Sequence, residues 1–382
     1  MASSTPSRFH VLGAGPSGAL AALALAQLGH EVALADPQSE VQLQARSRAY
    51  AITHSSRRLL ERLGLWMDLL PWLVPFQELD LRDAGVHRRV LFSLDDLDPT
   101  SRSHGAIGWI LDHGPLMAQL ILRLKASSLV ALQLGTPASA PSQNSIVVAA
   151  DGPGSPARQA WGIRTWSHRY RQGCLTAKVA LRGVDPGQAY ELFRPEGPLA
   201  VLPLAEGCFQ VVWSAPLSRC QERADLSPAA FLDQLAGVLP EGIEPDLLID
   251  QPRAFPQQLM LARRLSSGRG VLLGEAAHRC HPVGGQGLNL CWRDVETLAA
   301  VAAGAGSPQS KARHYARQRW LDVVLVSLAT DALVRLFSNR QPLLLPLRSL
   351  GLLLLHKVGL FRRLSLRAMT NGPLQILSPL SN

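Results

Sequence analysis

The fold of this chain is decided by FHVLGAGPSGALAALALAQLGHEVALAD, residues 9–36. The apolar run at 9–12 predicts a strand, the alanine- and leucine-rich run at 19–28 predicts a helix that ends at Gly29, and residues 31–35 predict a second strand closed by Asp36. Two strands joined by a crossover helix form a βαβ unit, which requires a parallel sheet. We therefore expect an α/β protein.

The glycines of GAGPSG suit a nucleotide. Gly13 permits a tight turn, Gly15 lets the backbone approach a pyrophosphate, and Gly18 lets the helix pack closely on the sheet. The helix N-terminus offers free N–H groups to phosphates, and a carboxylate at Asp36 is placed to accept ribose hydroxyls. The alternative interpretation of these six residues is a glycine-rich strand–helix turn that binds no ligand. The preceding strand, the following helix and the distance to Asp36 favour dinucleotide binding.

A second motif is VVAADGPGSPAR, residues 147–158. An apolar strand leads into Asp151-Gly152, followed by Gly154, Ser155 and Arg158. Asp-Gly pairs are common in ordinary turns, so this stretch indicates a ligand site only in combination with the first motif.

The third motif is VLLGEAAHRCHPVGGQGLNLCWRD, residues 271–294. Its polar residues allow three interpretations: a metal site, a nucleophile at Cys280, or a ligand-holding loop. The candidate metal ligands are Glu275, His278, Cys280 and His281. Adjacent Cys280 and His281 cannot easily point at one ion, and no second pair of ligands lies elsewhere in the sequence at the spacing usual for zinc. Nothing else supports a nucleophile. A strand, then Gly284, Gly285 and Gly287, then a helix from Leu288 to Ala303, favours backbone N–H groups that hold a ligand.

Composition limits the partners and the compartment. The 382 residues carry 38 Lys+Arg and 29 Asp+Glu, a net charge of +9 that can attract nucleic acid, anionic lipid or anionic ligands. Aromatic residues make up only 5% and are not interleaved with the basic ones, so no nucleic-acid partner is predicted. Five cysteines without a CxxC pair indicate a reducing compartment. Because no signal-peptide pattern begins the chain, we expect a cytoplasmic protein.

The three motifs, in this order, resemble those of the class A flavin monooxygenases, relatives of p-hydroxybenzoate hydroxylase. GAGPSG with Asp36 resembles their ADP-binding fingerprint, AADGPGSPAR their DG motif, and GEAAH…HPVGGQGLNL their GDAAH…HPxxGQGxN motif. Arg48, in RSRAYAIT, resembles the arginine beside the FAD phosphates. The resemblance implies FAD as the cofactor, no metal, and flavin-centred chemistry without an identified catalytic side chain. The implied FAD-binding residues are Gly13, Gly15, Gly18, Asp36, Arg48, Asp151, Gly274, Glu275, Gly285, Gln286, Gly287, Leu288 and Asn289.

Further segments resemble the ubiquinone-biosynthesis hydroxylases: AYELFRPEGPLAVLPL (189–204) with Trp213, HRYRQGC (168–174), GQGLNLCWRDVETLA (285–299) and TDALVRLFSN (330–339). This resemblance implies that a flavin C4a-hydroperoxide, formed with O2 and electrons from NAD(P)H, hydroxylates the ring of a polyprenylated quinone precursor. Glu275, Cys291 and His113 depart from the family, which usually has Asp, Gly, and Asn or Arg there. A flavin reductase or halogenase, and an inactive flavoprotein scaffold in a quinone-biosynthesis complex, stay open as alternatives.

The expected organisation is a Rossmann-like FAD-binding domain of the glutathione-reductase type, interrupted by a mostly β substrate domain. The FAD-binding parts are 1–75, 106–165 and 263–310; the substrate parts are strands in 76–105 and the β-sheet domain 166–262; residues 311–382 form a helical, basic C-terminal region. Within the first part, residues 53–66 are expected to be helical.

The C-terminal region has no Asp or Glu after Asp331 and seven basic residues: Arg335, Arg340, Arg348, Lys357, Arg362, Arg363 and Arg367. Its apolar run LLLPLRSLGLLLLHKVGLF (343–361) is shorter than the ~20 uninterrupted residues of a membrane span. Such a segment suits a helix on the anionic inner face of a membrane, where each basic group contributes about 1 kcal/mol. Packing on the FAD-binding domain or on another subunit stays open, because the basic residues do not share one helical face.

Overall fold

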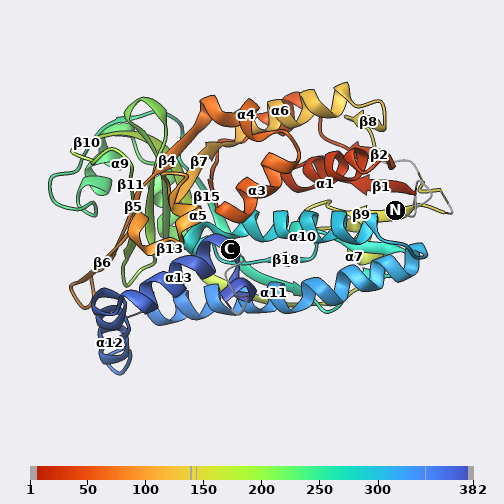
Figure 1. The fold of residues 1–382 in the computed structure, drawn as a ribbon. Helices are drawn as coiled ribbons and strands as arrows, with labels where there is room; N and C mark the ends of the chain where they lie inside the picture. The colour runs from red at the N-terminus through yellow and green to blue at the C-terminus, as the bar shows by residue number, and fades with distance from the viewer. Residues whose placement is uncertain (1–6, 138–139, 143, 340, 377–382) are drawn as a thin grey trace.

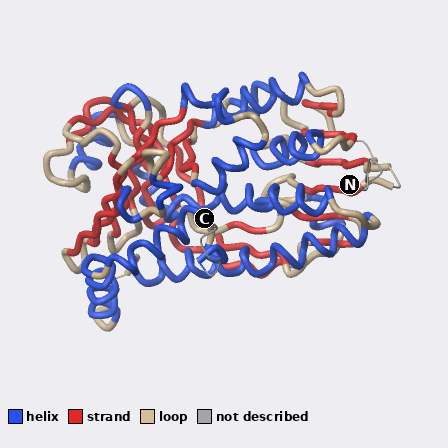
Figure 2. The backbone as a smooth tube through the Cα atoms, in the orientation of Figure 1, coloured by secondary structure: helices blue, strands red, loops and turns tan. Residues whose placement is uncertain are grey.

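The computed structural model describes residues 7–376 except 138–139, 143 and 340. Figure 1 shows two large sheets side by side, with helix α10 (Gln286–Ala303) next to helix α1 (Pro16–Gln27) in the half that contains strand β1 (Arg8–Leu12) and helix α11 (Pro308–Phe337) along the lower edge. Figure 2 shows the strands gathered in these two groups, with helices covering the group that contains the N-terminus. The predicted α/β fold with a helical C-terminus is confirmed.

The first sheet has the strand order β16–β17–β9–β1–β2–β8. Strand β1 pairs in parallel with β2 and β9, and further parallel pairs join β2 to β8 and β9 to β17. Only β16 runs antiparallel in this order. The strand bounds are β1 Arg8–Leu12, β2 Glu31–Asp36, β8 Val130–Leu134, β9 Ile146–Ala149, β16 Ser266–Ser267 and β17 Gly270–Leu272.

Helix α1 (Pro16–Gln27) lies against this sheet and contacts α6 (His113–Ala126) and α10. Its sequence is apolar on almost every side, as expected of a helix with neighbours all round. Pro16 suits the first turn, where no intrahelical donor is needed. A Cβ at Gly18 would overlap the carbonyl oxygen of Gly13, so this close approach requires glycine.

The second sheet has nine strands and is mostly antiparallel, in the order β18–β15–β10–β13–β12–β11–β5–β6, with β14 paired to β10. Strand β18 comes from the third glycine motif and pairs with Met260 and Leu261 of β15. The third motif is therefore joined to both sheets. The bounds are β5 Glu78–Asp83, β6 Arg88–Ser93, β10 Thr165–Arg182, β11 Gln188–Phe193, β12 Leu199–Pro203, β13 Cys208–Pro216, β14 Glu244–Leu248, β15 Arg253–Ala262 and β18 His278–Arg279.

A small third sheet, not predicted from the sequence, is formed by β3 (Ala49–Ile52), β7 (Gly108–Asp112) and β4 (Leu73–Phe76). The predicted helical segment over 53–66 is confirmed from His54 to Arg62. Helix α3 (His54–Arg62) ends before Gly64, which has a φ of +67°, and a separate short helix α4 (Trp66–Leu69) follows. A left-handed glycine just after a helix ends it by satisfying its last carbonyl groups.

The other helices are short. They are α2 Glu40–Gln44, α5 Pro99–Arg102, α7 Pro156–Ala160, α8 Leu217–Ala224 and α9 Pro228–Ala236. Helix α10 begins at Gln286, two residues earlier than predicted.

The C-terminal helix α12 (Leu344–Lys357) packs on β6 of the second sheet, and α13 (Gly359–Asn371) packs on α12 and α3. Arg348 of α12 is fully buried and donates from Nε to Asp83 Oδ2 at 2.9 Å; Arg362 of α13 donates from Nε to Asp96 Oδ1 at 2.7 Å. Arg335 of α11 likewise donates from Nε to Asp331 Oδ2 at 2.7 Å, so Arg335, Arg348 and Arg362, three of the seven predicted tail cations, pair with carboxylates of the protein; Arg340 lies outside the described residues.

Over the described ranges, no single helix has both the length and the hydropathy of a membrane span. Residues 342–357 and 359–371 meet the criteria only as a pair, which is bent by 98°.

Candidate functional site

The three glycine motifs meet at one edge of the first sheet. Leu12 of β1 is in register with Ala149 of β9, and Ala149 is in register with Leu272 of β17. Because these strands are parallel, their carboxyl ends lie together, and each is followed directly by a glycine motif. Ligands of open α/β sheets bind in the crevice at this edge.

Gly13 and Gly15 have different roles in the first turn. Gly13 has a φ of +96°, and a Cβ there would overlap the carbonyl of Ala150, so the fold itself requires this glycine. Gly15 has a φ of −63°, and a Cβ there would meet nothing within 4 Å. No side chain caps the N-terminus of α1, which begins after Gly15. Open space beside free helical N–H groups is what a phosphate needs.

Asp36 ends β2 and is buried. Its Oδ2 accepts the backbone N–H of Ala14 at 2.7 Å, and its Oδ1 accepts that of Gln38 at 2.8 Å. The carboxylate thus fixes the first turn against β2. Since each carboxylate oxygen has two lone pairs, both keep capacity for a hydroxyl donor.

Asp151 has a buried oxygen without a partner. Its Oδ2 accepts the N–H of Ala157 at 3.0 Å, whereas Oδ1 is buried and has no hydrogen-bond partner among the described residues. Buried polar atoms in proteins are nearly always hydrogen-bonded, because the unsatisfied state is costly. A ligand hydroxyl that donates to Oδ1 would satisfy this atom.

Arg158 joins the second motif to the third. Its Nη1 donates to the carbonyl of Ala276 at 2.8 Å, and its Nη2 donates to that of Pro153 at 2.8 Å. Because one guanidinium group donates to both carbonyls, it fixes the distance between the second and third motifs.

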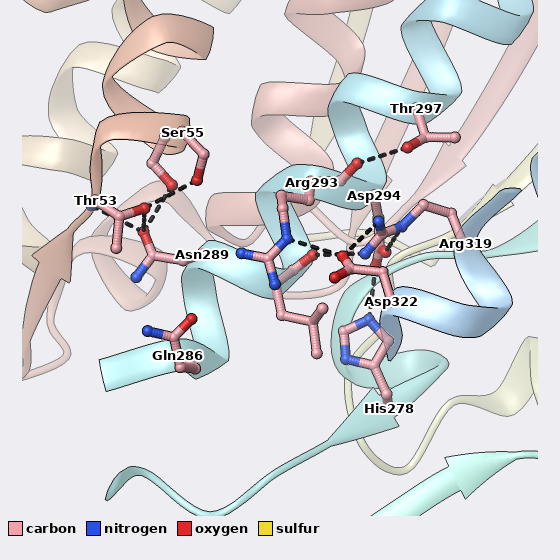
Figure 3. Close-up of polar contacts among 12 residues, drawn as sticks. Thr53, Ser55, His278, Gln286, Asn289, Arg293, Asp294, Thr297, Arg319 and Asp322 are labelled. Carbon is pink, nitrogen blue, oxygen red and sulfur yellow. Dashed lines mark hydrogen bonds and ion pairs between the residues drawn. The ribbon is translucent and has the colours of Figure 1, made fainter. Parts of the chain in front are cut away.

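The loop before α10 is held by Asn289. The buried Oδ1 of Asn289 accepts from the N–H and hydroxyl of Thr53 at 3.1 and 3.0 Å and from the hydroxyl of Ser56 at 2.7 Å. Its Nδ2 donates to the carbonyls of Ala51 at 2.7 Å and Gly285 at 2.8 Å. Figure 3 shows this side chain turned toward Thr53 and Ser55, away from Gln286. Asn289 therefore positions the loop, with little capacity left for a ligand.

Gly284 and Gly285 have φ values of +69° and +64°, and no side chain caps α10 at Gly285. Gln286 donates from Nε2 to the carbonyl of Met369 in α13 at 3.1 Å. The loop thus exposes its backbone and the uncapped N-terminus of α10. Its polar side chains instead hydrogen-bond to other parts of the protein.

A buried ion network anchors the start of the third motif (Figure 3). Asp294 Oδ2 accepts from His278 Nε2 at 2.7 Å and from the N–H of Gly274 at 2.9 Å, and Asp294 Oδ1 accepts from Arg319 Nε at 2.7 Å. Arg319 and Arg293 both donate to Asp322, at 2.7 and 2.8 Å. Burial alone raises the pKa of Asp294, but His278, Arg319 and the hydrogen bonds outweigh it and bring that pKa to about 2.

These network residues were not identified as site residues from the sequence. The sequence signal that identifies them is charged residues on the buried faces of two helices. Arg293 and Asp294 lie in α10, and Arg319 and Asp322 lie in α11. Such residues are rarely buried unless they are paired.

The structure does not favour the metal or nucleophile interpretations of the third motif. His278 binds Asp294, and the His281 ring packs edge-on against Tyr170, with centroids 5.5 Å apart. Burial raises the pKa of the Cys280 thiol to about 11, which makes its thiolate scarce at neutral pH. Within the described ranges, no group of three or more His, Cys, Asp or Glu residues has the arrangement of a metal site.

A cavity of about 620 Å³ connects this crevice to the second sheet and the C-terminal helices. At one end it is lined by Arg48, Glu275, Cys291 and the loop 284–288. Apolar side chains of α11, α12 and α13 also line it, including Leu333, Leu336, Leu352, Leu355 and Leu366.

His113 lies behind the cavity wall. It is buried, accepts from the Tyr50 hydroxyl at Nδ1 at 2.9 Å, and donates from Nε2 to the carbonyl of Leu43 at 2.7 Å. This departure from the family pattern therefore has a structural role beside Tyr50, which itself lines the cavity.

Known proteins are similar to this chain in sequence and in fold. A family model described as "FAD binding domain" matches residues 144–319. The ubiquinone hydroxylase UbiL of Rhodospirillum rubrum is 30% identical, over 94% of this chain and 88% of that protein. The 3-demethoxyubiquinol 3-hydroxylase of Escherichia coli is 28% identical, over 95% and 98%. A crystal structure of a Klebsiella pneumoniae HpxO variant complexed with FAD has a TM-score of 0.74 at 20% identity, covering 96% of this chain and 98% of that one.

We expect Asp294→Asn to lower the free energy of unfolding by about 3 kcal/mol at pH 7, because it leaves the buried Arg319 and Arg293 to share the single carboxylate of Asp322. The pKa of Asp294 is about 2 in the folded protein and about 4 in an unfolded chain. Its contribution is therefore complete above pH ~4 and lost as the pH falls through 2. Urea unfolding followed by circular dichroism between pH 7 and pH 3 measures it.

The control is Glu296→Gln, which removes an exposed carboxylate of the same helix that pairs with Arg62. It should change stability by less than about 1 kcal/mol. An equal loss in both variants, or a loss in Asp294→Asn that does not shrink at acid pH, would contradict the role given to the network.

Proposed function

Because the chain belongs to the FAD-dependent class A flavin monooxygenases, in the group that contains the ubiquinone-biosynthesis hydroxylases, we propose that it hydroxylates the aromatic ring of a polyprenylated quinone precursor. The cofactor FAD supplies the redox chemistry with O2, using electrons from NAD(P)H. The protein binds the two ends of the substrate, orients the ring and excludes water.

The observation that carries the proposal is the shape and lining of the cavity. It extends from the glycine loop 284–288 to a wall of aliphatic side chains on α11, α12 and α13. Its volume of about 620 Å³ lies within the usual range for small-ligand sites. A phenolic ring at the loop with an isoprenoid tail along Leu333, Leu336 and Leu355 matches this distribution. The names of the two relatives, both quinone hydroxylases, support the same substrate class.

We propose that FAD lies in the crevice at the carboxyl ends of β1, β9 and β17. The N-terminus of α1 beside Gly15 and the guanidinium of Arg48 suit its phosphates, and Asp36 suits a ribose. Asp151 Oδ1 and Glu275 suit further hydroxyls, and the N-terminus of α10 suits an anionic ring. Gly13, Gly18, Gly274 and Asn289 act through the backbone and the packing; the loop from Gly285 through Gln286 and Gly287 to Leu288 presents its backbone to the flavin.

We expect Gly15→Val to fold and to lose FAD. Its φ is allowed for valine and its Cβ has open space, so the added side chain meets only a bound pyrophosphate. Purified protein should contain less than about a tenth of the wild-type flavin by absorbance, with an unchanged far-UV circular dichroism spectrum.

The matched control is Gly237→Val, at an exposed helix end with a φ of −65°. It should keep its flavin. A full flavin complement in Gly15→Val would show that the crevice does not hold the pyrophosphate.

The hydroxylase proposal is tested with purified holoenzyme, NADH or NADPH, and isotopically labelled O2. With a polyprenylated phenol, mass spectrometry should detect a product that has gained one labelled oxygen atom. In Leu355→Gln, KM for that substrate should rise roughly tenfold, because a polar group disturbs the tail end of the cavity. Leu353→Gln is the control, since Leu353 is on the same helix but is not part of the lining.

Three other outcomes would separate the alternatives. NAD(P)H oxidation without oxygen transfer to any phenol would indicate a reductase. A product that forms only when halide is present would indicate a halogenase. The absence of NAD(P)H oxidation under every condition would indicate a scaffold. Each contradicts hydroxylation.

We also propose that the C-terminal helices dock on a lipid surface, from which the isoprenoid tail enters. Leu343, Leu347, Leu350 and Leu354 are exposed and spaced along one side of α12 and the residue before it. Leu352 and Leu355 of the same helix line the cavity. Figure 1 shows α12 projecting from the lower left of the molecule. Because Arg348 and Arg362 have internal carboxylate partners, burial of apolar side chains contributes more to docking than charge does.

We expect the triple variant Leu347→Ser, Leu350→Ser, Leu354→Ser to lose most of its flotation with phospholipid vesicles. Removal of residues 341–382 is a poorer test, since it also removes part of the cavity wall. The control is Leu122→Ser, an exposed leucine on α6. Equal flotation of the triple variant and the wild type would rule out docking through α12.

A further inference from the structure

Glu191 is a carboxylate on the cavity face of the second sheet. It lies on β11, in register with Leu81 of β5 and Ala200 of β12. All three residues line the cavity. The same row continues through Val212 of β13 to Thr176 of β10. One acidic side chain thus stands in a row that is otherwise apolar apart from a threonine hydroxyl.

The carboxylate lies at the end of the cavity where the glycine loop is. The backbone N–H of Gly284 lies near it and favours its charged form, and Gly284 directly precedes the N-cap of α10. A group that contacts this loop is close to the position proposed for the flavin ring. Glu275 is the other carboxylate that lines the described cavity, and it has a role in the proposed FAD site.

The surroundings of Glu191 change its ionisation. Burial raises its pKa to about 7, against the opposing effect of the Gly284 backbone N–H. Strands β5 and β12 present apolar side chains to it, at Leu81 and Ala200, and the lining side chains of α11, such as Leu333 and Leu336, are apolar. The thiol of Cys174 comes from β10, and Arg279 and Cys280 come from the loop. On β5, Asp80 pairs with Arg82 and Arg89.

Other groups at the cavity are unsuited to take a proton near neutral pH. The hydroxyls of Tyr50 and Tyr190 hydrogen-bond to His113 and Gln188. Burial raises the pKa of the Cys174 thiol to about 12 and that of Cys280 to about 11, so both stay protonated. His278 is held by Asp294.

We propose that Glu191 binds the phenolic hydroxyl of the substrate and accepts its proton. The O–H bond breaks, the proton moves to a carboxylate oxygen of Glu191, and the electron pair stays on the phenolate oxygen. The ring becomes more electron-rich and thus a better acceptor of electrophilic oxygen. The proton returns to the same oxygen when the product leaves. This assignment rests on the proposed hydroxylase function for its substrate, and it makes Glu191 a general base.

The first test is Glu191→Gln, which keeps the shape of the side chain and removes its basicity. With a polyprenylated phenol, kcat for hydroxylation should fall about a hundredfold or more. A base works as its carboxylate, so wild-type kcat should fall as the pH is lowered through about 7. In Glu191→Gln this acid limb should be absent, while flavin content and the thermal midpoint stay at wild-type values.

Two variants separate a proton acceptor from a pocket-shaping residue. Glu191→Asp keeps a carboxylate and should keep the acid limb, at a reduced rate. Thr176→Val alters the same row of the cavity without changing its acid–base groups, and it should keep the limb whatever its effect on the rate. A Glu191→Gln enzyme with kcat within twofold of wild type, or with the limb intact, overturns the proposal.

A binding measurement tests Glu191 independently of turnover. The probe is 4-nitrophenol, whose phenolate form absorbs in the visible. Bound to the wild-type holoenzyme at pH 7.5, the probe should show phenolate absorbance that Glu191→Gln lacks, because an apolar cavity without an acceptor disfavours the anion. Equal phenolate in both proteins refutes the assignment. If the wild type binds the probe as phenolate but hydroxylates no phenol, the proposed function fails while the role of Glu191 as a proton acceptor stands.

Discussion

The interaction on which the rest of this molecule depends is the buried carboxylate of Asp294. Its two oxygens bind the N–H of Gly274, the imidazole of His278 and the guanidinium of Arg319, and thereby join the loop after β17 to α10 and α11. The loop continues as β18, at the edge of the second sheet. One ion network therefore fixes the positions of both sides of the cavity. The network is costly to break because each partner is buried. Such a network suits a site that must hold a large cofactor in one position.

The cavity has two kinds of lining, one polar and one apolar. At the crevice, the proposed FAD site consists of backbone N–H groups, uncapped helix ends and a few carboxylates, and side chains such as Asn289 fix the loop. The lining contributed by α11, α12 and α13 is mostly apolar, and α12 also exposes leucines to the outside. A polar crevice continuous with an apolar channel fits a substrate with a reactive ring and a long hydrocarbon tail. The buried pair of Arg348 and Asp83 keeps α12 in place, so the tail of the chain is part of the site.

The chemistry assigned to the protein is limited because FAD carries the redox steps. What is left for side chains is to hold the cofactor, to exclude water and to control one proton. The apolar row that contains Glu191 serves the last two tasks together, since the burial that excludes water also raises the pKa of that carboxyl toward 7. Near that value a carboxyl can take up and release a proton within one turnover.

Local sequence by itself determined the βαβ start, the three glycine motifs and their order, because turn chemistry and hydrophobic periodicity depend on neighbouring residues. Resemblance to a known family then implied FAD and the enzyme class. Only the tertiary structure decided which side chains meet: Asp294 with Arg319, Arg158 with Ala276, and Arg348 with Asp83 are 25, 118 and 265 residues apart. The location of Glu191 also depends on strand register, since a shift by one residue would turn it to the opposite face. The seven tail cations suggested a charged surface, yet long-range pairing buried Arg348 and left the leucines of α12 exposed, which no local pattern specifies.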